Sequence, residues 1–170
     1  MNPSEQGPAE PGLAPRPSRP KFRGLPIKAE GEGEGLVPWQ WAVEQLEVAR
    51  NYWLATVRAD GTPHAMPVWG VWLDGLFYFD THPQSQKVRN LRAQPRAVVH
   101  LESGSEVVIL EGVIDVEDDD IEEGELFERI AAAYETKYGN RPFGAFAFRP
   151  HVSYAWREDF TGSATRYAFD

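Results

Sequence analysis

The chain of 170 residues contains no cysteine, which removes several kinds of chemistry at once. Disulfides, thiolate metal sites and thiol nucleophiles all require that side chain. The sequence also has no run of about 20 apolar residues, the length that crosses a bilayer, and no apolar signal-peptide segment near residue 1. We therefore expect a cytoplasmic protein without a membrane partner, whose structure depends on packing.

Positive charge is scarce as well. The chain has 17 Lys and Arg against 26 Asp and Glu, a formal net charge of −9. Such a surface repels nucleic acid and anionic lipid on average. We expect no nucleic-acid partner, and any site for an anion must be a local basic pocket.

What is present suffices for one folded domain. Hydrophobic residues make up 42% of the chain and aromatic residues 12%, enough for a core. Residues 1–35 are instead rich in Pro, Gly, Glu and Arg and show neither helical nor strand periodicity. The composition predicts a disordered or loosely packed tail over 1–35 and a single domain over 36–170.

The domain begins with a helical pattern and continues as short strands. Apolar residues recur at helical spacing from Trp39 to Ala49. The pairs Asp60-Gly61 and Asp74-Gly75 favour tight hairpin turns. Strands are predicted at 52–58, 64–73, 76–80, 97–102, 107–116, 145–148, 152–156 and 165–169, and further helices at 85–93 and 121–138. This order favours an α+β barrel with antiparallel strands over a parallel sheet.

One segment could bind an anion. The stretch from Asp80 to Leu91 leaves a strand and enters a helix, where backbone N–H groups and the helix dipole favour negative charge. The Thr81 and Ser85 hydroxyls and the Lys87 ammonium could converge there on a phosphate. Alternatively, one hydroxyl only caps the helix and the lysine is solvated. Spacing alone leaves both interpretations open.

Two longer stretches carry a resemblance to a known family. YWLATVRADGTPHAMPVWGVW and, after a turn, LFYFDTHPQSQKVRNLRAQPRAVVHLE resemble the pyridoxamine 5′-phosphate oxidase-like, FMN-binding split-barrel superfamily. The likeness covers about 37–169. The matching motif residues, in chain order, are Thr81, Ser85, Lys87, Pro95, Trp156 and Arg166.

The resemblance implies a fold, a cofactor and an assembly. The implied fold is α+β, a six-stranded antiparallel split β-barrel with flanking helices. The implied cofactor is FMN, bound without a covalent bond, with its phosphate at Thr81, Ser85 and Lys87. Its ring would lie against the strand formed by Met66, Pro67, Val68 and Trp69. Trp156 and Arg166 would reach the cofactor of the partner chain in a homodimer. Without the resemblance, residues 66–69 would be expected to form an ordinary buried strand and Trp156 to be an ordinary core aromatic.

The chain departs from the oxidase pattern near its end. The family's pyridoxamine phosphate oxidases carry an Arg-x-His element just before the C-terminal arginine, whereas this chain reads Gly162-Ser163-Ala164-Thr165-Arg166. The contacts that hold that substrate are therefore missing. We expect a flavin-dependent oxidoreductase that acts on a different small molecule.

Two other functions remain open. Many members of the superfamily bind a deazaflavin, coenzyme F420, and Arg58, Arg89 and Arg92 could serve its acidic tail. A module that binds flavin or haem without catalysis is the second alternative. Flavin chemistry needs no particular catalytic side chain, so none is assigned. The four histidines, His64, His82, His100 and His151, have no metal-ligand spacing, and no metal site is expected.

Overall fold

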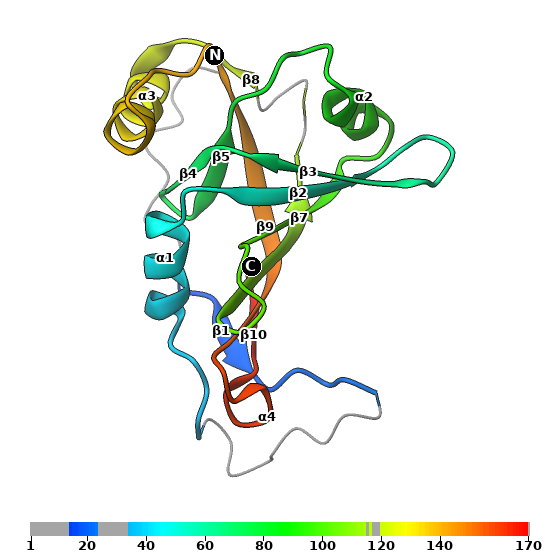
Figure 1. The fold of residues 1–170 in the computed structure, drawn as a ribbon, viewed down its shortest axis with the longest axis vertical. Coiled ribbons are helices and arrows are strands. Elements are labelled where there is room, and N and C mark those ends of the chain that lie inside the picture. Colours follow the sequence, from blue (N-terminus) through cyan, green and yellow to red (C-terminus); the bar gives the residue numbers. More distant parts are fainter. Residues whose placement is uncertain (1–13, 24–33, 115, 117–119, 170) are drawn as a thin grey trace, which may run out of the picture.

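The computed structural model describes residues 14–23, 34–114, 116 and 120–169 (Figure 1). Its strands are β1 (Arg16–Ser18), β2 (Tyr52–Val57), β3 (Pro63–Val68), β4 (Gly70–Leu73), β5 (Leu76–Phe79), β6 (Arg96–His100), β7 (Val107–Val113), β8 (Asp120–Ile121), β9 (Ala145–Trp156) and β10 (Thr165–Ala168). Its helices are α1 (Trp39–Val48), α2 (Gln86–Ala93), α3 (Gly124–Tyr138) and α4 (Phe160–Ser163). None of these helices is long and apolar enough to cross a membrane.

The long strand β9 joins two antiparallel sheets. The larger sheet has the order β1-β10-β9-β7-β6-β2-β3, and the first part of β9 also pairs with β5 and β8, with β4 beside β5. Figure 1 shows β9 running through most of the molecule between these parts. This arrangement confirms the predicted α+β fold, an antiparallel split barrel with flanking helices.

Two apolar clusters form the core: a larger one between α1, α2 and strands of both sheets, and a smaller one between α3, β4, β5 and β9. The largest fully buried side chains come from strands of both sheets and from α1, α2 and α3, and they include Tyr52, Phe77, Phe79, Phe148, Leu110, Leu46, Leu91 and Ile130. Strands β2, β6 and β7 alternate buried and less buried residues along much of their length, as expected for a sheet with one face on the core. The core therefore fixes the strands that carry the site.

Several element boundaries differ from the sequence prediction. The strand predicted at 64–73 is broken at Trp69 into β3 and β4, and the strands predicted at 145–148 and 152–156 form one strand. Pro150 is tolerated within that strand because it lies opposite Gly112, at a β-bulge where His151 is an extra residue of β9 between the partners of Glu111 and Gly112. Position 112 must be glycine, because the Cβ of any other residue would lie 2.0 Å from the Arg149 carbonyl oxygen.

The helix predicted over 121–138 begins later than expected. Ile121 belongs to β8, and α3 starts at Gly124. The predicted end is confirmed, because Gly139 caps α3 with φ 80° and donates its N–H to the Glu135 carbonyl oxygen.

Part of the predicted tail packs on the barrel. Within residues 14–23, β1 pairs with β10, and the Phe22 ring lies 5.7 Å from the Phe160 ring. Arg19 also donates a hydrogen bond to the Ala164 carbonyl oxygen. The division into a tail over 1–35 and a domain over 36–170 stays a prediction, and within it residues 16–18 pair with the edge strand β10. Residues 1–13 and 24–33 lie outside the described residues.

Candidate functional site

The start of α2 brings together three residues that the sequence singled out. The Lys87 Nζ donates to the Thr81 Oγ1 at 3.1 Å, and the Thr81 hydroxyl lies 3.4 Å from the Ser85 Oγ. Ser85 is the N-cap residue of α2, and its Oγ accepts a hydrogen bond from the Val88 N–H. Thr81, Ser85 and Lys87 thus form one cluster, and Ser85 also caps the helix.

The Lys87 ammonium has capacity for a ligand. Among the described residues its hydrogen bond goes to Thr81 alone, although an ammonium carries three donors. Burial lowers the pKa of Lys87. A nearby anion would offset that burial by favouring the charged form. The first N–H groups of the helix add positive partial charge at the same end.

A polar network holds α2 against the barrel. The buried Asn90 donates to the Thr56 Oγ1 on β2 at 2.9 Å and accepts from the Gln86 Nε2 at 2.7 Å. On β3, the pKa of His64 is lowered by its burial and by the charges of Arg58 and Lys87. The buried Asn90 therefore ties α2, and with it the cluster, to β2.

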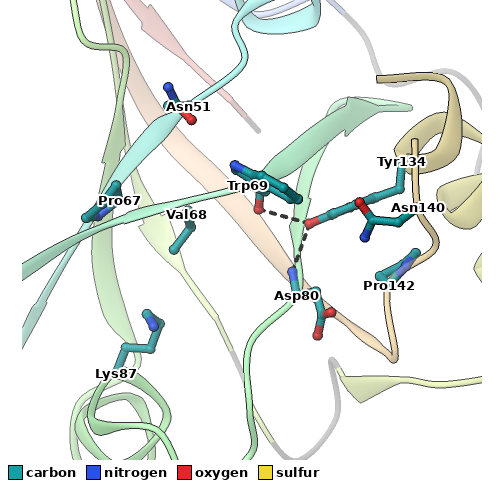
Figure 2. A pocket seen from close by; sticks show the side chains of 9 residues that line it. All are labelled: Asn51, Pro67, Val68, Trp69, Asp80, Lys87, Tyr134, Asn140 and Pro142. Atoms are coloured by element: carbon teal, nitrogen blue, oxygen red, sulfur yellow. Dashed lines mark hydrogen bonds between the residues drawn. The ribbon is translucent and has the colours of Figure 1, made fainter. Parts of the chain in front are cut away.

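The facing part of the site is built by the end of α3 and the break between β3 and β4. The Trp69 ring stacks on the Tyr138 ring, with centroids 4.6 Å apart and planes within 4°. The Tyr134 hydroxyl donates to the Trp69 carbonyl oxygen and accepts from the Asp80 N–H, both at 2.9 Å (Figure 2). Trp69 is nevertheless 44% exposed, so its side chain is held in place while part of it faces solvent.

A second half-buried lysine, Lys137, connects the end of α3 to the residues around Ala49, Tyr52 and Gly70, a region called the α3 corner below. The Lys137 Nζ donates to the Ala49 carbonyl oxygen at 2.9 Å, the Tyr52 hydroxyl at 2.8 Å and the Gly70 carbonyl oxygen at 3.3 Å. Burial lowers the pKa of Lys137 to about 8, an effect that the negative charge of Glu47 opposes. Lys137 uses its donors within the protein and contributes to its structure.

A pocket of about 400 Å³ lies between these two parts. This volume falls in the range of small-molecule sites, roughly 300–1,000 Å³. Its lining residues come from α2, α3, β3 and the adjoining loops: Asn51, Pro67, Val68, Trp69, Asp80, Lys87, Tyr134, Asn140 and Pro142.

The sequence predicted part of this lining. Pro67, Val68, Trp69 and Lys87 were expected at the site. Met66, Thr81 and Ser85, also expected, are not among the lining residues, and Met66 is 44% exposed. The other lining residues were missed, because they approach the pocket from loops and from a helix far away in the chain.

Comparison with known proteins identifies the family. The family model described as pyridoxamine 5′-phosphate oxidase matches residues 40–157, more than half of the chain. The chain belongs to this family. A search of curated proteins finds no matching sequence.

Solved structures similar to this family member share its fold at low sequence identity. A conserved hypothetical protein from Mycobacterium tuberculosis matches with TM-score 0.62 and 23% identity, over 75% of this chain and 89% of that one. An F420 reductase matches with TM-score 0.50 and 23% identity, over 65% and 94%. The haem storage protein HutZ from Vibrio cholerae matches with TM-score 0.51 and 18% identity, over 66% and 88%.

The remaining two site residues expected from the family pattern lie elsewhere in the chain. Phe146 in β9 pairs with Phe79, which lies two residues before Thr81, whereas Trp156 lies ten residues farther along β9. At about 3.3 Å per residue, and with a bulge between them, the two residues lie at most about 33 Å apart along the strand. Arg166 pairs with Tyr154 at that distant end. Within one chain, Trp156 and Arg166 therefore do not join the cluster of Thr81, Ser85 and Lys87.

The segment before Arg166 contains the short helix α4 and leads directly into β10. Gly162 and Ser163 belong to α4, and the Ser163 Oγ donates to the Asp159 carbonyl oxygen. Ala164 and Thr165 are buried. In the described part of the chain, no group of three or more His, Cys, Asp or Glu side chains is placed to hold a metal ion.

Proposed function

We propose that this family member binds FMN non-covalently in the pocket beside α2 and acts as a flavin-dependent oxidoreductase. The observation that carries the proposal is the convergence of Thr81, Ser85 and Lys87 at the start of α2, at the edge of a pocket of about 400 Å³. The substrate is a small molecule other than pyridoxamine phosphate.

The donor set fits a phosphate group. Two hydroxyls, a cation and a helix start form the combination that binds phosphate in many proteins. The protein's net charge of −9 repels anions on average. The cluster is a local site of positive charge where an anion can nevertheless bind. Burial disfavours the charged form of Lys87. A bound phosphate would compensate for this cost.

The rest of the pocket suits a planar ring. Pro67, Val68 and Trp69 supply apolar surface at the end of β3, and the Trp69 ring is kept rigid by its stack on Tyr138. A bound flavin would supply hydride or electron transfer through its ring. The residues of this chain would orient that ring and exclude water from it.

The proposed site is completed by a second copy of the chain. Trp156 and Arg166 would contribute to the site of the partner in a homodimer, which accounts for their distance from the cluster of their own chain. Light scattering of the flavin-loaded protein should give twice the monomer mass of 19.2 kDa at micromolar concentration. A flavin-loaded monomer would rule out a shared site.

Two other cofactors are kept as alternatives. An F420 reductase and the haem storage protein HutZ share the fold, so a deazaflavin-dependent reductase or a non-catalytic flavin or haem binder is compatible with the family. The arginines that an acidic deazaflavin tail would need are partly engaged, since Arg58 donates to the Pro63 carbonyl oxygen and Arg89 to the Gln84 carbonyl oxygen. The visible spectrum of the loaded protein distinguishes flavin, deazaflavin and haem.

The decisive experiment titrates FMN and riboflavin into the apo protein and its Lys87→Ala variant. A charge-assisted hydrogen bond contributes on the order of 1.5–3 kcal/mol, so FMN binding should weaken about 10- to 100-fold. Riboflavin has no phosphate, and its affinity should hardly change.

The matched control is Arg89→Ala, which removes an exposed cation from the same helix. It should leave both affinities within about twofold. Equal FMN affinities in wild type and Lys87→Ala would mean that the phosphate does not bind at α2.

A further inference from the structure

The pocket contains a carboxylate that the sequence did not single out. Asp80 directly follows β5 and lines the pocket. Its N–H donates to the Tyr134 hydroxyl at 2.9 Å, and its Oδ2 accepts from the Phe143 N–H at 3.1 Å. These two contacts, to residues more than 50 positions away, fix the orientation of Asp80.

This carboxylate and the Lys87 ammonium occupy separate walls. Figure 2 shows Lys87 entering from α2 and Asp80 lying beside Tyr134 on the other side of the pocket. In the described part of the chain they do not pair, since Lys87 donates to Thr81 and Asp80 accepts from Phe143. The pocket therefore has a positive end and a negative end.

Each end suits a different part of a ligand. An ionised carboxylate only accepts hydrogen bonds, so it favours N–H and O–H groups and repels a second anion. The ammonium favours the anionic group. A ligand that fits both ends carries one anionic terminus and an uncharged portion rich in donors.

We propose that Asp80 is a specificity-determining residue of this pocket, whose carboxylate accepts a hydrogen bond from an N–H or O–H group in the uncharged portion of the bound flavin. This inference rests on the proposed function and adds to it a residue outside the phosphate cluster. It distinguishes the two walls by the part of the ligand that each recognises: Lys87 recognises the phosphate, and Asp80 recognises the ring or its polyol chain.

The test uses Asp80→Asn, which removes the charge but keeps an acceptor for the Phe143 N–H. FMN and riboflavin are titrated into the apo wild type and the variant, and bound flavin is followed by its fluorescence. Riboflavin affinity should fall about 5- to 20-fold, because a charge-assisted hydrogen bond is replaced by a weaker neutral one. FMN affinity should fall by no more than this, in contrast to Lys87→Ala, which affects FMN alone.

The matched control is Asp74→Asn, the same change at an exposed aspartate that pairs with Arg129. It should leave both affinities unchanged. If Asp80→Asn does not fold, as judged by thermal unfolding, Asp80→Ser provides an uncharged acceptor of smaller size and should weaken riboflavin in the same way.

The outcomes separate the two proposals. If the wild type binds neither flavin, the proposed function and this inference are both overturned. If the wild type binds both flavins and Asp80→Asn binds riboflavin equally well, only the role of Asp80 is overturned. A tighter FMN complex with unchanged riboflavin affinity would also overturn it, since Asp80 would then only repel the phosphate.

Discussion

Lys87 and Lys137 are both half-buried, both have a pKa lowered by burial, and differ in what surrounds the ammonium group. Lys137, in the last turn of α3, donates to three acceptors of the protein and lies over the Tyr52 and Tyr138 rings. Lys87, in the first turn of α2, has Thr81 as its one hydrogen-bond partner among the described residues.

The difference is the one expected between a structural cation and the ligand-binding cation that we propose. Burying a charge without partners costs free energy, so a buried ammonium is kept where something compensates it. For Lys137 the compensation comes from the C-cap residue of α1, from β2 and from β4. For Lys87, Thr81 supplies one partner, and in the proposed function a phosphate would supply the rest. The end of α3 would then be a fixed wall of the pocket, and the start of α2 the part that contacts the ligand.

Replacing Lys137 should give the largest effect on stability. Lys137→Met keeps most of the apolar stem but leaves the Ala49 and Gly70 carbonyl oxygens without the ammonium. Hydrogen bonds to charged groups contribute about 1.5–3 kcal/mol each, but the variant also removes the cost of a half-buried charge, and partial exposure reduces both effects. The free energy of unfolding should therefore fall by about 1–2 kcal/mol. Urea unfolding at pH 7 measures this loss. A loss below about 0.5 kcal/mol would mean that the hydrogen bonds of Lys137 do not stabilise the α3 corner.

The pH dependence of the free energy of unfolding, compared between the wild type and Lys137→Met, tests the charge of Lys137 directly. The folded-state pKa of Lys137 is about 8, below its ordinary value of 10.5, so the unfolded state binds more protons between these two values. The free energy of unfolding of the wild type, relative to Lys137→Met, should therefore rise as the pH increases from about 8 to 10. Burial raises the pKa of Tyr52, which keeps this partner protonated in the window. If the free energies of unfolding of the two proteins differ by the same amount at every pH from about 8 to 10, the pKa of Lys137 is not lowered.

The same contrast explains what the sequence could reveal about the site. Thr81, Ser85 and Lys87 lie within seven residues, so the geometry of one strand-to-helix turn brings them together. Asp80 and Tyr134 are 54 positions apart, and their contact depends on how α3 docks on the barrel. Local spacing contains no information about such docking. The fixed wall was therefore missed, while the cluster on α2 was predicted.

The fold shows the same division. Hairpins with Asp-Gly turns and the helix that ends at Gly139 were predictable because their signals are local. The pairing of β1 with β10 joins residues about 150 positions apart, and the segment before α1 has too few apolar residues to indicate it. The bulge that admits Pro150 into β9 likewise depends on Gly112 in another strand.

The smallest expected effect is that of Lys87→Met on the protein without ligand. The variant loses one hydrogen bond to Thr81 and also the cost of a half-buried charge, and these changes oppose each other. The free energy of unfolding should change by about 0.5 kcal/mol or less in either direction. With excess FMN the difference should widen to about 1.4–2.7 kcal/mol in favour of the wild type, the equivalent of 10- to 100-fold tighter binding. Urea unfolding with and without FMN measures both values, and a loss above about 1 kcal/mol in the ligand-free protein would place Lys87 with Lys137 among the structural cations.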